Sequence, residues 1–192
     1  MPKLTLAAES WPIAGTFTIS RGSKTSAEVV TVTLQQDGKV GRGECVPYPR
    51  YKETVPQVLA ALEAIRPEIE AGIRRSDVPQ LLTPHAARNA LDCALWDLDA
   101  KLSGEPVWQR ARLSPPGPLT TAYTISLAEP EAMAEAALRA AHMPLLKLKL
   151  GRDSDEQRLR AVRTAVPRAR LIIDANEGWH EAELLRLLAL SA

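Results

Sequence analysis

The sequence predicts two regions of different architecture, an α+β region followed by a (β/α) region built on parallel strands. Three observations lead to this prediction. The first part of the chain reads as strands and then helices, a Pro-rich stretch follows at residues 115–118, and after it strands and helices alternate three times. Strands grouped before helices are typical of α+β folds, whereas regular alternation is typical of parallel sheets covered by helices. We therefore expect one domain over residues 1–117 and a second over residues 118–192.

The first region is expected to contain a β-hairpin and then three helices. Residues 27–36 and 39–46 are the two strands, joined by Asp37-Gly38, a dipeptide that favours tight hairpin turns. Thr54 can cap the first helix, which runs to about residue 70. The other two helices are expected to begin at Ser76-Asp77 and at Pro84, and the last one to end near Gly104.

The second region repeats a strand–helix unit. Strands are expected at residues 119–127, 145–150 and 171–176, and helices at 129–142, at 153–166 and from His180 to the C-terminus. A closed barrel of such units has eight strands. We therefore expect the chain to be truncated relative to a natural protein, with only about three units of a barrel.

Two lysines on the second of these strands point to chemistry. Side chains alternate along a strand, so Lys147 and Lys149 share one face, and Asp174 and Asn176 share one face of the next strand. A lysine pair can also mark the wet face of an antiparallel sheet, but that arrangement requires hairpin turns, and here helices flank the strand. Two cations and a carboxylate at neighbouring strand ends are suited to an anion or a metal.

The composition excludes several classes of partner. The 192 residues have a formal net charge of +1, so no strong field attracts nucleic acid or an anionic membrane. No apolar run approaches the length of a membrane span. Cys45 and Cys93 are too few for a disulfide framework, which favours a reducing, cytoplasmic location.

Four stretches and the lysine pair together resemble the enolase superfamily. The stretches are Ile19–Gly22, Gly43–Tyr51, Ala87–Leu98 and Ile173–Glu177. Within that superfamily the chain is similar to the muconate-lactonizing branch, and most like its dipeptide epimerases of the L-Ala-D/L-Glu type. The resemblance implies an α+β capping domain over residues 1–117, and the start of a truncated TIM-type barrel over residues 118–192.

The resemblance also implies a reaction and its residues. Enolase-superfamily enzymes remove a proton α to a carboxylate and stabilise the enediolate with Mg²⁺. Lys149 matches the catalytic base, and Lys147 matches the neighbouring lysine that contacts the substrate carboxylate. Asp174 matches the first of three carboxylate ligands of the metal, with Asn176 as a supporting neighbour.

Three further residues are expected to touch a dipeptide substrate. Arg21, on a loop over residues 17–22, offers a guanidinium fork for a second carboxylate, such as that of a C-terminal glutamate. Thr124, near the end of the first barrel strand, matches a substrate-contacting position, and Tyr51, on the second loop of the cap, is expected to help form the wall of the substrate pocket. Lys52 stands where the family pattern has a glycine, which puts the shape of that second loop in question.

Other conspicuous residues are expected to be structural. Gly41-Arg42-Gly43-Glu44 lacks the strand–turn–helix context of a phosphate loop and is interpreted as strand. The arginines from Arg158 to Arg170 are interpreted mainly as a solvated helix face. Asp92, Trp96 and Asp97 lie on a helix and are assigned to packing and surface pairing.

Alternatives remain open at this point. The other metal ligands, a second catalytic lysine and the acids that recognise the substrate amino group belong to later strands of the family. We therefore expect the 192-residue polypeptide alone to be inactive, and the identity of the dipeptide is not predicted. Other possibilities are an o-succinylbenzoate synthase or cycloisomerase, or a non-catalytic fragment. We also expect a homo-oligomer, or association through the unfinished barrel edge.

Overall fold

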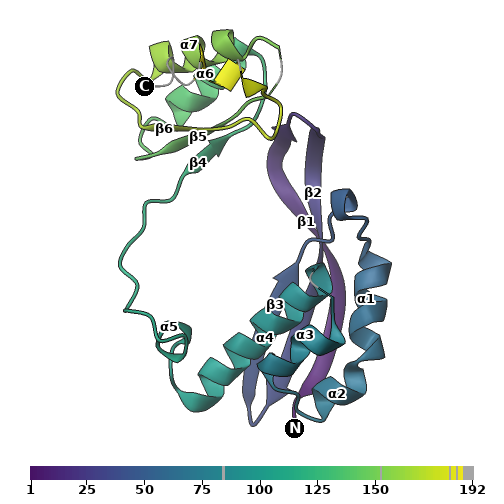
Figure 1. The fold of residues 1–192 in the computed structure, drawn as a ribbon. Helices are drawn as coiled ribbons and strands as arrows, with labels where there is room; N and C mark the ends of the chain where they lie inside the picture. The colour runs from purple at the N-terminus through teal and green to yellow at the C-terminus, as the bar shows by residue number, and fades with distance from the viewer. Residues whose placement is uncertain (84, 152, 182, 185, 188–192) are drawn as a thin grey trace. The chain divides into compact units, whose positions relative to one another are not determined.

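A computed structural model describes residues 1–83, 85–151, 153–181, 183–184 and 186–187. The chain divides into two compact units, one made of residues 1–12 and 26–117 and the other of residues 13–25 and 118–192 (Figure 1). Strands β1 (Lys3–Ile19) and β2 (Gly22–Gln36) are long enough to contribute to both. The tip of the hairpin that they form therefore groups with the second unit.

The predicted hairpin between residues 27 and 46 is confirmed. Strand β3 (Lys39–Cys45) pairs antiparallel with β2, in a register that runs from Gln36↔Lys39 to Val30↔Cys45. Asp37 and Gly38 both have positive φ angles, of 49° and 73°, as the tight turn requires.

The loop expected over residues 17–22 is shorter in the structure. Strand β1 continues to Ile19, Ser20 and Arg21 form a two-residue turn, and β2 begins at Gly22. The β-branched residues that precede the turn favour a strand. Gly15 and Gly22 interrupt the strand-like sequence pattern, and both have positive φ angles.

The helices of the first unit follow the predicted order. They are α1 (Val55–Ala64), α2 (Arg66–Glu70), α3 (Val78–Leu81), α4 (Ala86–Ser103) and α5 (Val107–Arg110), with short 3₁₀ turns η1 (Pro49–Tyr51) and η2 (Arg75–Asp77). Thr54 caps α1 by accepting a hydrogen bond from the Gln57 amide at 3.4 Å. The single helix expected to reach residue 70 is split at Ile65, because Pro67 cannot donate to the helical ladder. Helix α4 ends at Gly104 as predicted, and Pro84 lies outside the described residues.

Two glycines of β3 explain how closely α4 approaches the sheet. A Cβ on Gly43 would lie 2.0 Å from the Ala90 carbonyl oxygen, and a Cβ on Gly41 would lie 2.4 Å from that of Ala94. Both positions therefore exclude a side chain, and the Gly-x-Gly motif serves helix–strand packing rather than phosphate binding. The core beneath α4 is apolar, with Val30, Val32, Leu34, Leu62, Ala90, Leu91 and Ala94 fully buried.

The second unit holds a parallel sheet of order β4-β5-β6. Its strands are β4 (Tyr123–Ile125), β5 (Leu146–Lys149) and β6 (Leu171–Asp174), and its helices are α6 (Pro130–Arg139) and α7 (Asp155–Ala165). Both helices cover one face of the sheet (Figure 1). Their Met133, Ala137, Leu159 and Val162 bury Leu146 and Leu148 of β5.

The strands of this unit are shorter than the sequence predicts. Strand β4 begins at Tyr123 instead of residue 119, because residues 119–122 follow the proline run and Leu119 is 92% exposed. The last expected helix is helical at residues 181, 183–184 and 186–187. Residue 180 is not helical, and positions 182, 185 and 188–192 lie outside the described residues. In the described part of the chain, no helix has both the length and the apolar character needed to cross a membrane.

Candidate active site

The lysine pair lies on the face of the β4–β6 sheet that α6 and α7 do not cover. Leu146 and Leu148 point into the helix-covered core and are fully buried, so the alternating side chains of Lys147 and Lys149 point to the opposite face. Lys149 is nevertheless only 7% exposed, whereas Lys147 is half-buried. The predicted shared face of the two lysines is confirmed.

Both lysines converge on one carboxylate of the neighbouring strand. Lys149 is paired in register with Asp174. Its Nζ lies 2.7 Å from Asp174 Oδ2, and the Nζ of Lys147 lies 2.9 Å from the same oxygen. The other oxygen, Oδ1, accepts a hydrogen bond from the Asn176 amide at 3.0 Å. The structure thus brings together the cations and the carboxylate that the strand pattern predicts.

The electrostatics of this cluster favour an anionic ligand. Burial opposes ionisation of Asp174, but hydrogen bonds from Lys149, Lys147 and the Asn176 amide outweigh it and hold the pKa of this carboxyl well below its usual range. The carboxylate is therefore ionised, and two ammonium groups against one carboxylate leave the cluster with one formal positive charge.

The tip of the β1–β2 hairpin covers this cluster. The Phe17 ring lies 5.5 Å from Lys149 Nζ, within the range of a cation–π contact. Ser20 Oγ and Arg21 Nη1 both donate to the Asn176 carbonyl oxygen, at 3.2 and 2.8 Å. The Leu127 amide donates to the Thr18 carbonyl oxygen at 3.1 Å. The tip is therefore fastened to the chain that follows β4 and to the chain that follows β6.

Arg21 and Thr124, predicted to touch substrate, both belong to this unit. Arg21 lies 3.8 Å from Glu177, and its side chain is 37% exposed. Thr124 on β4 pairs in register with Lys147 on β5, so the side chain of Thr124 lies on the same face of the sheet as the two lysines. Their roles in binding a dipeptide stay predictions.

Tyr51 belongs to the first unit. It ends η1, is 59% exposed, and its ring centroid lies 5.8 Å from that of Tyr48. The next residue, Lys52, adopts a left-handed conformation with φ 60° and ψ 32°. This geometry explains why a glycine is expected at that position. The contact of Tyr51 with substrate stays a prediction.

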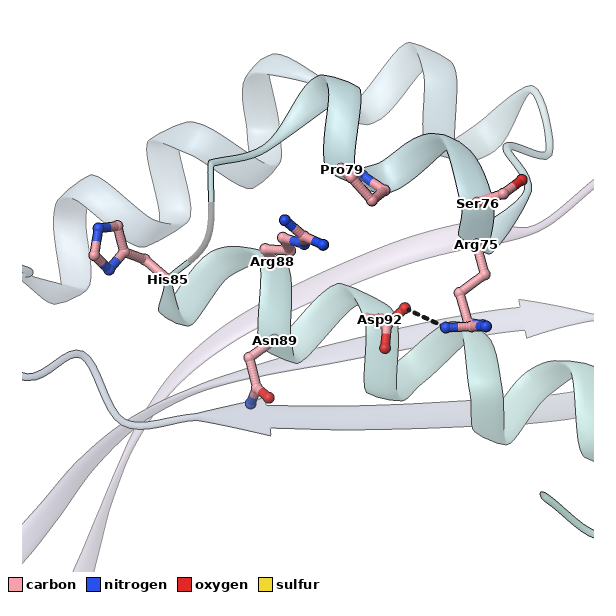
Figure 2. Close-up of a pocket in the computed structure, with 7 residues that line it drawn as sticks. All are labelled: Arg75, Ser76, Pro79, His85, Arg88, Asn89 and Asp92. Atoms are coloured by element: carbon pink, nitrogen blue, oxygen red, sulfur yellow. Dashed lines mark hydrogen bonds and ion pairs between the residues drawn. The ribbon is translucent and has the colours of Figure 1, made fainter. Parts of the chain in front are cut away.

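A hollow of about 390 Å³ lies in the first unit, between α3 and α4 (Figure 2). Arg75 forms an ion pair with Asp92 at 3.2 Å, and its guanidinium carbon lies 3.9 Å from the centroid of the Trp96 ring. Asp92 and Trp96 thus take part in surface pairing and packing, as predicted. Arg75 and Asp92 of this hollow neutralise each other, whereas the lysine cluster keeps a net charge, so the cluster is the better candidate for catalysis.

The described residues fit a metal ion only in part. Asp174 supplies a carboxylate at a strand end, and the Asn176 Oδ1 atom is buried without a hydrogen-bond partner. Within the ranges given above, however, no three His, Cys, Asp or Glu side chains lie together as metal ligands would. Mg²⁺ requires about six oxygens in octahedral geometry, so these residues alone do not form a complete site.

Comparison with known proteins identifies the family. The model of the mandelate racemase / muconate lactonizing enzyme N-terminal domain matches residues 1–110, more than half of the chain. The chain belongs to this family. A second model, the enolase C-terminal domain-like model, matches residues 130–191. The resemblance to the enolase superfamily and the expected fold class, a capping domain followed by part of a barrel, are thereby confirmed.

Individual family members extend the match. The L-Ala-D/L-Glu epimerase of Escherichia coli K12 is 43% identical over 89% of this chain and 54% of its own length. An enolase-family structure from Agrobacterium tumefaciens, with homology to dipeptide epimerases and with bound sodium and L-Ala-L-Glu, superposes with a TM-score of 0.92. It is 50% identical over all of this chain and 59% of that one. A dipeptide epimerase from Cytophaga hutchinsonii, in complex with Mg and D-Ala-L-Val, is 26% identical with a TM-score of 0.82, over 97% of this chain and 55% of that one. The chain therefore spans about half the length of the curated family members that it matches.

The sequence interpretation missed one pair of residues beside the site. Arg158 was assigned to a solvated helix face, but it is only 6% exposed and pairs with Asp155, which is 4% exposed. The sequence offered a weak signal, since an aspartate in the first turn and an arginine three residues later face each other on a helix. Burial of the pair depends on the loops that pack over it.

Proposed function

We propose that this chain provides the capping domain (residues 1–117) and the first barrel units (residues 118–192) of a dipeptide epimerase. Its substrate would be a dipeptide of the L-Ala-D/L-Glu type, and the reaction would invert the α-carbon of the C-terminal residue. The observation that supports this proposal best is the convergence of Lys147 and Lys149 on Asp174 at adjacent strand ends. The names of the family members described above favour a dipeptide epimerase over a related cycloisomerase.

The base in this proposal is Lys149. Its side chain is nearly buried at the carboxyl end of β5 and lies against Phe17, so water has little access to the ammonium group. A lysine fixed at a strand end reaches one side of a substrate α-carbon. Its neutral amine would remove the proton on that side, and the ammonium formed in this way would return it. A positioned acid–base group of this kind contributes about 10²–10⁴-fold to the rate.

Lys147, Arg21 and Thr124 would bind the substrate. Lys147 is more exposed than Lys149 and shares its face, so its charge can offset the substrate carboxylate as negative charge develops on the enediolate. Arg21 would receive the second carboxylate of a C-terminal glutamate. Thr124 would add a hydroxyl beside Lys147, and Tyr51 is proposed as a further substrate contact.

We propose Mg²⁺ as the cofactor, with Asp174 as one ligand and Asn176 as its support. When bound, a divalent cation of this kind makes the α-proton more acidic by stabilising the enediolate. The remaining ligands would come from outside the described residues. Because Cys45 and Cys93 are both free thiols, we place the protein in the reducing cytoplasm.

The test is α-proton exchange in the complete protein, meaning this chain together with the remaining length that its relatives have. Dipeptides with different N- and C-terminal residues are incubated in heavy water, and deuterium at the C-terminal α-carbon is followed by NMR. We expect exchange with L-Ala-L-Glu and L-Ala-D-Glu, lost on chelation and restored by Mg²⁺. The proposal is wrong if no dipeptide exchanges its α-proton.

A further inference from the structure

A buried ion pair lies beside the lysine cluster and makes contacts with three loops. Asp155, in the first turn of α7, accepts hydrogen bonds at Oδ2 from the Gly151 amide at 2.6 Å and from the Trp179 indole at 2.7 Å. Its Oδ1 lies 3.1 Å from Arg158 Nη1. Arg158 in turn donates from Nε to the Ala128 carbonyl oxygen at 2.7 Å and from Nη1 to the carbonyl oxygen of Asp153.

These contacts reach the chain that follows each strand of the sheet. Ala128 follows β4, Gly151 and Asp153 follow β5, and Trp179 follows β6. In barrel enzymes the chemistry takes place at this carboxyl-terminal end of the strands. One ion pair therefore connects the three loops beside Lys149 and Asp174.

The loops after β5 and β6 also touch each other directly. A Cβ on Gly151 would lie 2.1 Å from the Ala175 carbonyl oxygen, and a Cβ on Gly178 would lie 2.4 Å from the Gly151 carbonyl oxygen. Such backbone contact leaves no room for a side chain. The position of Lys149, two residues before Gly151, is therefore coupled to the position of Asp174, one residue before Ala175.

The chemistry of the pair suits positioning better than simple stabilisation. Two charges that are 4% and 6% exposed gain little net stability over apolar residues of similar size, because both must be removed from water. Their hydrogen bonds, by contrast, are directional and end on the backbone and the indole of the three loops. A fixed geometry of those loops is what this arrangement provides.

We propose that Asp155 and Arg158 are positioning residues, which hold Lys149 and Asp174 in the geometry required for α-proton transfer. This inference rests on the function proposed above. Removal of a group that orients reacting side chains typically lowers activity about 10–100-fold. The effect is expected in kcat rather than in KM, because both side chains are nearly buried and their hydrogen bonds end on the loops.

The test compares Trp179→Phe and Asp155→Asn with Arg160→Ala. Arg160 lies on the same helix, but its side chain is 61% exposed, and among the residues that the structure describes it pairs only with Glu156. In the complete protein we expect the first two variants to lower kcat for exchange about 10-fold or more, with KM within about twofold of wild type. Arg160→Ala should leave both constants unchanged.

Hydrogen exchange of the 192-residue chain, measured by mass spectrometry, provides a readout that does not need activity. We expect faster exchange in the segments 150–155 and 174–180 of both test variants, with the rest of the second unit unchanged. Faster exchange throughout the unit, or a loss of kcat no greater than that of Arg160→Ala, would overturn the positioning role. Absence of turnover in the wild-type complete protein would refute the proposed function instead, and the exchange pattern would still decide whether the pair fixes the loops.

Discussion

Replacement of Asp174 by Asn would leave the two lysines without their shared anion. Their Nζ atoms lie 2.7 and 2.9 Å from one oxygen, so they are at most about 5.6 Å apart. Two unit charges at that separation repel each other by about 3 kcal/mol at an effective dielectric constant of about 20. The side chain of Lys147 is 33% exposed and can turn toward water, which relieves part of this repulsion. We therefore expect Asp174→Asn to destabilise the second unit by about 2 kcal/mol at pH 7 and low salt.

The assay is urea unfolding, in which the loss of structure is monitored by pulsed hydrogen exchange of peptides that cover β5 and β6. Glu135→Gln is the matched control, because Glu135 is a well-exposed partner of Arg139 at 3.7 Å, and loss of such a pair costs at most about 1 kcal/mol. The pKa of Asp174 is depressed in the folded state, so its stabilising effect is complete above the ordinary aspartate pKa of about 3.9. The difference between wild type and variant should shrink as the pH falls below that value. A difference no larger than that of the control, or one that grows on acidification, would refute the reasoning.

Three further predictions follow from the described residues. Lys52→Gly should stabilise the first unit by about 0.5–1 kcal/mol in thermal unfolding, because φ is 60° at this position. If the variant is no more stable than wild type, the left-handed geometry costs nothing here. Gly151→Ala should destabilise the second unit by more than about 2 kcal/mol, because φ of Gly151 is 116° and an added Cβ would meet the Ala175 carbonyl oxygen. Gly117→Ala is the control, because an added Cβ there would meet open space. The 192-residue polypeptide alone should show no α-proton exchange with L-Ala-L-Glu and Mg²⁺, because its described residues supply one metal carboxylate; exchange above background would contradict this.

The sequence predicted the centre of the candidate site well, because strand parity is a local property. Alternation alone placed Lys147 with Lys149, and the order of strands and helices placed Asp174 beside them. Burial of Arg158 could not be predicted in the same way, since it depends on three loops from different parts of the chain. The hairpin tip at residues 17–22 was missed as a strand because glycines obscured the pattern. Its contacts with Asn176 join residues more than 150 positions apart, which no local pattern records.

The central claim is that Lys149 is the base on one side of the substrate α-carbon and that Lys147 assists binding. The most direct measurement is deuterium incorporation from heavy water into L-Ala-L-Glu and L-Ala-D-Glu, taken separately, with the Lys149→Ala and Lys147→Ala forms of the complete protein. We expect Lys149→Ala to abolish exchange from one isomer, by at least about 10²-fold, while exchange from the other isomer persists. Lys147→Ala should raise KM for both isomers. If Lys149→Ala slows both isomers equally and Lys147→Ala affects neither, the assignment of base and helper is wrong, and the pair is an electrostatic platform.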